Sequence, residues 1–182
     1  MTGTGDTSLT LAGEPTVEHL DHEVLNGHRF ADGQGFPQSY RRFVENVGWG
    51  RAFGLWLIYP PVLDGYADGW QGRAANLTAR FRSVYQDGQR EGYDWMVEPD
   101  GSWDLCSGLE VFGWSENGDG LLWQPAARSP DGELPVWESR GIDSLHLLGP
   151  DLDTALAVLR TRTRASLGPR THDVEPLPAV RL

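Results

Sequence analysis

Residues 109–123 are LEVFGWSENGDGLLW, two apolar runs that flank a polar turn. Asn, Asp and Gly reverse a chain at low cost because they tolerate left-handed backbone conformations. Apolar runs on both sides of such a turn predict a β-hairpin. Turn residues at 100–101 and 130–132 separate this hairpin from its neighbours in the sequence. We therefore expect a series of short strands here, with further strands near 136–137 and 145–148.

A helix is predicted immediately after Phe36. Pro37 suits the first turn of a helix, and apolar residues then recur at positions 40, 43, 44 and 47, which share one helical face. Gly48 is placed to end this helix in a left-handed conformation. Similar spacing predicts a helix over 73–86, closed by Asp87 and Gly88, and another over 151–164, stopped by Gly168. The aromatic and branched run at 53–59 predicts a buried strand.

The two ends of the chain differ in composition from the middle. Residues 1–24 are polar and glycine-rich, and residues 168–182 are rich in proline and polar residues. We expect a loosely ordered N-terminal segment, one domain over 25–167 and a flexible C-terminal tail. The sequence shows neither a secretory leader nor an apolar stretch of about 18 residues, and it has a single cysteine, Cys106. These features favour the cytoplasm.

The charge of the chain limits its possible partners. The formal net charge is −11, and all 15 basic residues are arginines. Nucleic acid and anionic membranes favour basic surfaces, so neither is an expected partner, whereas a basic protein is. The alternative is that the acidity reflects the composition of a GC-rich genome and has no bearing on binding.

Candidate catalytic and metal-binding patterns do not match known sites. The acidic and histidine-rich segment 18–23 lacks the spacing of zinc proteases, and the turn at 115–120 departs from a calcium loop at its first and twelfth positions. No serine lies in a nucleophile elbow, and Cys106 has no recognisable histidine partner. We therefore expect no catalytic, cofactor-binding or metal-binding residues and predict that the chain is not an enzyme.

The eight tryptophans are many for one domain. Indole rings are enriched both in cores and at the centres of protein interfaces, so the eight could form a binding face. We expect Trp56, Trp95 and Trp123 to lie in the core. We expect Trp49, Trp70 and Trp103, which lie beside glycines or turns, to be partly exposed.

Three stretches of the chain resemble the SUKH superfamily, which includes bacterial immunity proteins and a fungal cell-wall regulator. Residues 36–43, followed by Gly48, are similar to the family's proline-led helix with its closing glycine. Residues 112–123 resemble the family's central hairpin, and the chain from Pro135 to Arg164 resembles its closing strands and helix. The likeness spans residues 25–166. The chain departs from the family pattern in lacking a clear helix before Pro37 and in carrying a long insertion between the first helix and the hairpin.

The resemblance implies an α+β fold, with a mixed, mostly antiparallel sheet and helices packed around it. It also implies a non-catalytic protein-binding role, in which an immunity protein neutralises a cognate toxin, often a nuclease, by covering its active site. An acidic surface would attract such a basic toxin domain. The candidate partner-binding residues are Trp114, Glu116, Asp119, Asp131, Glu133, Glu138 and Asp143. The alternative is a scaffold or regulatory adaptor of the same fold with no toxin partner.

Overall fold

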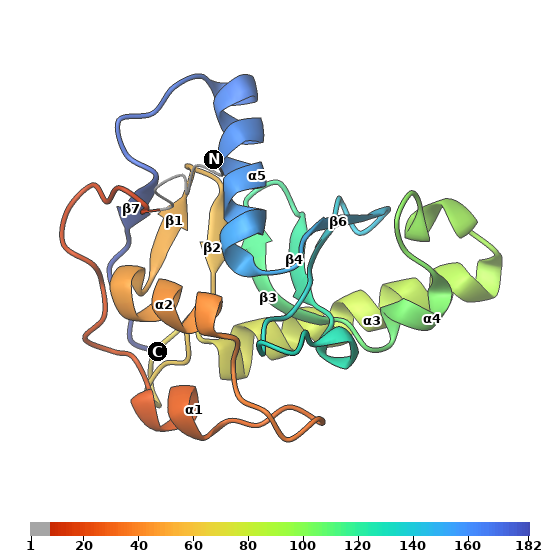
Figure 1. Cartoon of the computed structure of the whole chain (residues 1–182), viewed down its shortest axis with the longest axis horizontal. Coiled ribbons are helices and arrows are strands. Elements are labelled where there is room, and N and C mark those ends of the chain that lie inside the picture. Colours follow the sequence, from red (N-terminus) through yellow and green to blue (C-terminus); the bar gives the residue numbers. More distant parts are fainter. Residues whose placement is uncertain (1–7) are drawn as a thin grey trace.

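The computed structural model describes residues 8–182 and centres on a seven-stranded antiparallel sheet of order β6-β5-β4-β3-β2-β1-β7 (Figure 1). With its helices, this sheet makes the α+β fold that was expected. The strands are β1 (Gly50–Ala52), β2 (Trp56–Ile58), β3 (Glu110–Ser115), β4 (Gly120–Trp123), β5 (Val136–Ser139), β6 (Leu145–Gly149) and β7 (Val174–Pro176).

Helices cover both faces of the sheet. The α-helices are α1 (His22–Gly27), α2 (Gln38–Val47), α3 (Ala75–Glu91), α4 (Trp103–Cys106) and α5 (Leu152–Leu167). Shorter turns are the π-helical η1 (Trp70–Ala74) and the 3-10 turns η2 (Asp94–Val97) and η3 (Pro125–Ala127). Buried residues of α1, α2 and α5 share one core with the sheet, and those of α3 share a second core on the other face.

Alternating side chains of the central strands fill these two cores. Leu121 and Trp123 of β4 face α2 and α5, whereas Leu122 between them faces α3. Trp56 and Trp123 are fully buried, as expected. The predicted hairpin is confirmed as β3 and β4, and the strands predicted near 136 and 145 are confirmed as β5 and β6.

The helix after Phe36 is also confirmed. Tyr40, Phe43 and Val44 on its inner face are buried, and Gly48 follows it with φ +66°. A Cβ atom at Gly48 would lie 1.9 Å from the carbonyl oxygen of Thr16. Only glycine allows both this backbone conformation and this close approach.

The second helix ends later than predicted. α3 continues through Asp87 and Gly88 to Glu91, and Gly92 then takes the left-handed conformation that ends it. Gly88 lies inside the helix, and a Cβ atom added there would lie 2.2 Å from the sulfur of Met96 in η2, so the Met96 side chain would have to shift. Here glycine allows a neighbouring segment to pack closely, and it does not mark a helix end.

The prediction of loose ends differs from the structure. Within 1–24, residues 1–7 lie outside the described residues, and isolated bridges join Leu11 to Val174, Thr16 to Gly48 and Leu20 to Val62. Residues 22–27, which cross the expected boundary, form α1, a helix before Pro37 that the sequence did not indicate.

The C-terminal segment, expected as a flexible tail, contains β7, which pairs with β1 at one edge of the sheet. Asp173 beside it is buried and accepts hydrogen bonds from the backbone nitrogen of Thr10 at 3.0 Å and from Arg160 at 2.9 Å. The physical reason for the difference is that these residues pair with partners far away in the sequence, which local composition does not reveal.

Candidate functional site: an acidic aromatic surface

Two large aromatic rings are exposed side by side in the segment that follows α3. Tyr93 is 42% exposed and Trp95 is 51% exposed, and their rings stack with centroids 4.7 Å apart. Leu147 of β6, an exposed apolar residue, lies on the same edge hairpin as Asp143, which accepts a hydrogen bond of 3.0 Å from the Trp95 indole nitrogen. We call Tyr93, Trp95 and Asp143 the Trp95 surface.

Local structure explains why Trp95 points outward. Gly92 ends α3, and the backbone nitrogen of Tyr93 then bonds the carbonyl oxygen of Gly88 at 2.9 Å, which turns the chain back over the helix. In the short η2 turn, Met96 and Val97 point inward and are buried in the α3 core. Because these two side chains anchor the turn, the residue before them is left facing solvent.

Carboxylates are concentrated in the segment that carries the exposed rings. Residues 87–104 contain six acidic residues and a single basic one, Arg90. All six acidic residues are exposed: Asp87, Glu91, Asp94, Glu98, Asp100 and Asp104. Asp94 accepts a hydrogen bond of 2.9 Å from the indole nitrogen of Trp103, and Asp100 accepts one of 3.0 Å from the backbone nitrogen of Leu147. The segment therefore combines strong negative charge with hydrogen bonds that tie it to its surroundings.

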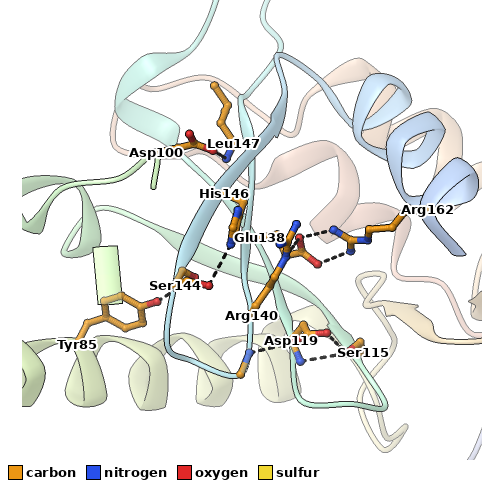
Figure 2. A network of polar contacts seen from close by, with 11 residues as sticks. Tyr85, Asp100, Ser115, Asp119, Glu138, Arg140, Ser144, His146, Leu147 and Arg162 are labelled. Atoms are coloured by element: carbon orange, nitrogen blue, oxygen red, sulfur yellow. Dashed lines mark hydrogen bonds and ion pairs between the residues drawn. The ribbon is translucent and has the colours of Figure 1, made fainter. Parts of the chain in front are cut away.

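A polar network holds the β5–β6 hairpin that carries Asp143 (Figure 2). Glu138 of β5 is fully buried and bonds Arg162 of α5 at 2.7 Å and Arg140 at 2.9 Å. Asp119 accepts a hydrogen bond of 2.9 Å from the backbone nitrogen of Gly141 at the tip of the hairpin. These contacts fix the hairpin from the α5 side and from the neighbouring β3–β4 turn.

The arginines of this network stabilise the ionised form of Glu138. Burial alone would raise the pKa of the Glu138 carboxyl, but hydrogen bonds and charge from Arg162 and Arg140 outweigh it and lower that pKa. His146 on β6 has a lowered pKa, mainly because of burial and also because of Arg140. Its Nε2 lies 3.0 Å from the Ser144 hydroxyl. On the other face, Tyr85 of α3 bonds the Ser139 hydroxyl at 3.0 Å.

Three of the seven residues predicted to bind a partner have structural contacts within the fold. Glu138 is the clearest correction, because its side chain is buried in two ion pairs and is not available to an outside protein. Glu133 has a structural role, since it accepts hydrogen bonds from the backbone nitrogen and hydroxyl of Ser39 at the start of α2. Asp119 holds Gly141 and the Ser115 hydroxyl. These three carboxylates support the fold.

The remaining four predicted residues are more accessible. Glu116 pairs with Arg51 at 2.8 Å, Asp131 is exposed in a loop beside Ser129, and Trp114 is half-buried. Among the predicted residues within 8–182, Asp143 contacts the exposed aromatic pair, through its hydrogen bond with Trp95.

Sequence reasoning missed Tyr93 and Trp95. Trp95 was wrongly expected in the core, and Trp49, expected to be partly exposed, is buried against Tyr59 with ring centroids 5.8 Å apart. Trp70 and Trp103 are half-buried, in line with the prediction for them. The concentration of six carboxylates in 87–104 was a usable signal for this surface, because a core-forming segment seldom carries so much charge.

Metal ligands, a thiol and long helices are the other features of residues 8–182 that could indicate a function. No group of three or more His, Cys, Asp or Glu side chains in this part of the chain could hold a metal ion. Burial raises the pKa of the Cys106 thiol to about 11, so the thiol is protonated at neutral pH. Among the described helices, none is both long enough and apolar enough to cross a bilayer.

No protein-family model, no characterised protein and no solved structure matches the chain.

Proposed function

We propose that this chain is a non-catalytic protein-binding domain that recognises a basic protein through the Trp95 surface. The observation that carries the proposal is the stacked, exposed pair Tyr93 and Trp95 within a segment of six exposed carboxylates. Large apolar rings are costly to leave in water, and Trp and Tyr dominate the energetics of protein interfaces. The carboxylates favour a partner that is positively charged.

The charge distribution supports a basic partner. The segment 87–104 contributes much of the negative charge of a chain whose net charge is −11. Negative surfaces accelerate encounters with basic proteins and disfavour acidic ones. The hydrogen bond between Trp95 and Asp143 supports the same view, because a ring already held in place loses less conformational entropy on binding.

The resemblance to the SUKH superfamily suggests what the partner is. Immunity proteins of that superfamily bind toxins in the cytoplasm, and nuclease toxins are basic because they bind nucleic acid. We therefore extend the proposal to a cytoplasmic immunity protein that covers the active site of a basic toxin domain. A regulatory adaptor would use the same surface for a different basic protein, and the identity of the captured partner distinguishes the two roles.

Affinity capture from the source cells tests the proposal. The tagged protein and its Trp95→Ala variant are compared, with Glu45→Gln on the exposed side of α2 as the control substitution. We expect a basic protein that is retained by the unmodified chain and by the control and is lost with Trp95→Ala. If that protein is a nuclease, adding the purified chain should abolish its activity.

Two outcomes would contradict the proposal. One is a specific partner that binds the Trp95→Ala variant as tightly as the unmodified chain. The other is an affinity that does not fall as salt is raised, because binding between opposite charges at an exposed surface weakens with ionic strength.

A further inference from the structure

A cavity of about 470 Å³ lies between the first turns of α3 and the start of β3. It is distinct from the Trp95 surface, which follows the other end of α3. Besides Trp70, five of its lining residues lie on η1 and α3, at 71, 75, 78, 79 and 82. Glu110 and Val111 of β3 face them across the cavity, and His28 and Trp70 complete the lining.

Two polar side chains in the lining already have hydrogen-bond partners within the fold. Gln71 exchanges hydrogen bonds with the backbone of Val62, at 3.1 and 3.2 Å. The Thr78 hydroxyl donates to the carbonyl oxygen of Ala74 at 3.0 Å and accepts from the backbone nitrogen of Val111 at 2.9 Å. These groups need no ligand.

Glu110 is different. Its carboxylate is half-buried and forms no hydrogen bond or ion pair with the residues that the structure describes. Burial raises the pKa of this carboxyl, and the charge of Arg82 only partly offsets that effect. The Glu110 carboxylate therefore lines the cavity partly desolvated and without a partner among residues 8–182, so a cationic group of a ligand could pair with it.

Arg82 supplies an opposite charge in the same cavity without neutralising Glu110. Its Nε and one terminal nitrogen donate to the carbonyl oxygen of Leu109, at 3.2 and 3.0 Å. This arrangement orients the guanidinium and leaves its other terminal nitrogen, Nη1, without a partner among residues 8–182. The two charges are close enough to interact but do not form an ion pair. A ligand with both an ammonium group and a carboxylate could bridge them.

The rest of the lining is apolar or aromatic. Trp70 lies beside the His28 ring, with centroids 4.6 Å apart, and Ala75, Ala79 and Val111 add aliphatic surface. Burial lowers the pKa of His28, so its imidazole is neutral at pH 7 and adds no charge. The lining therefore offers apolar contact beside a pair of separated charges.

We propose that this cavity binds a small zwitterion of the α-amino-acid class with an apolar side chain. The ammonium group lies at Glu110, the carboxylate at Arg82, and the side chain packs against Trp70, Ala75 and Ala79. The inference is independent of the proposed function, since it shares no residue with the Trp95 surface.

Calorimetric titration of the unmodified protein tests this directly. The probes are L-phenylalanine, L-leucine and L-methionine, with phenethylamine and 3-phenylpropionate as analogues of phenylalanine that lack the carboxylate and the ammonium group. We expect at least one amino acid to bind, and L-phenylalanine to bind at least about tenfold more tightly than either analogue, because each analogue leaves one charge unpaired. Failure of all three amino acids to bind at about 10 mM, a very weak affinity, would overturn the proposal.

Substitutions locate the binding. Glu110→Gln keeps the size of the side chain and removes its charge, and it should weaken amino-acid binding at least about tenfold. Glu45→Gln, on the exposed side of α2, is the matched control and should bind like the unmodified chain. Binding that survives Glu110→Gln unchanged would refute the site. If that variant unfolds, Trp70→Phe provides a second test, because its smaller ring reduces the aromatic contact and should weaken binding, and the analogue series on the unmodified chain needs no variant.

Discussion

Trp95 and Trp123 show how strongly the surroundings of a residue determine its contribution to stability. Trp123 is fully buried and stacks on Phe112 with ring centroids 4.2 Å apart, whereas half of Trp95 is in solvent. Replacing Trp123 by Ala should lower the free energy of unfolding by about 3–5 kcal/mol, because it opens a cavity in the core. Replacing Trp95 by Ala should cost less than about 1 kcal/mol. Urea denaturation followed by circular dichroism measures both.

Equal losses at the two positions would contradict the exposed position of Trp95. The sequence predicted Trp123 correctly because it lies in an apolar strand beside a clear turn. It did not predict Trp95, because a 3-10 turn of four residues is too short to show a periodicity. Which of three successive apolar residues faces solvent depends on the close contact between Met96 and Gly88, a contact that only the folded chain reveals.

Glu138 allows a second prediction at a single residue. Glu138→Gln removes the charge that Arg162 and Arg140 share and keeps the side-chain shape. The two arginine side chains are 37% and 45% exposed and can recover water, so we expect a loss of about 2 kcal/mol in unfolding free energy, below the range for fully buried pairs. Arg140→Gln, which leaves the pair with Arg162 intact, should cost less than about 1 kcal/mol. Thermal denaturation of both variants shows which of them loses more stability. A larger loss with Arg140→Gln than with Glu138→Gln would contradict the prediction.

At the scale of elements, β7 gives the clearest prediction. Its Val174 is buried in the core that α2 and α5 share, and its backbone covers the edge of β1. Truncation after Gly168 should lower the free energy of unfolding by about 2–4 kcal/mol, through loss of apolar burial, and should promote association through the uncovered β1 edge. Calorimetry and size-exclusion chromatography measure the two effects. A truncated chain that remains monomeric and melts at the original temperature would show that β7 contributes nothing.

The elements that the sequence predicted are those with local signals. α2 has apolar spacing and a closing glycine, and β3 and β4 are joined by an obvious turn. β1 and β7 have three residues each, too few to show alternation, and they pair with each other across more than a hundred residues. α3 was predicted too short because Gly88 is a packing residue, which the sequence alone cannot distinguish from a helix end.

At the scale of the whole molecule, the sequence established the net charge but not where it is exposed. Of the seven predicted binding residues, Glu138, Glu133 and Asp119 hold strands and helices together, and Asp143 alone lies beside the exposed rings within the described residues. Sequence cannot separate structural carboxylates from free ones, because the difference depends on distant partners such as Arg162 and Ser39.

The same charges determine how stability changes with pH. Burial lowers the pKa of His19, His28 and His146 below the usual 6.5, so the unfolded chain takes up these protons more readily than the folded one. Their contribution to stability is complete above pH 6.5 and is lost as the pH falls towards the folded-state values. The pKa values of Glu138 and Asp173 are lowered too, by arginine partners and, at Asp173, by Thr10, despite the opposing effect of burial. Their contribution is lost at lower pH, below the ordinary carboxyl range.

We therefore expect stability to fall in two steps on acidification, the first beginning near pH 6.5 and the second below about pH 4.5. Urea denaturation at pH 7.5, 5.5 and about 3 would resolve them. His19→Gln should shrink the first step, and His19→Gln combined with His146→Gln should shrink it further, because neither replacement titrates. The second step should remain in both variants, since it depends on Glu138 and Asp173. A first step of unchanged size in the double variant would mean that burial of these imidazoles does not govern the response to mild acid.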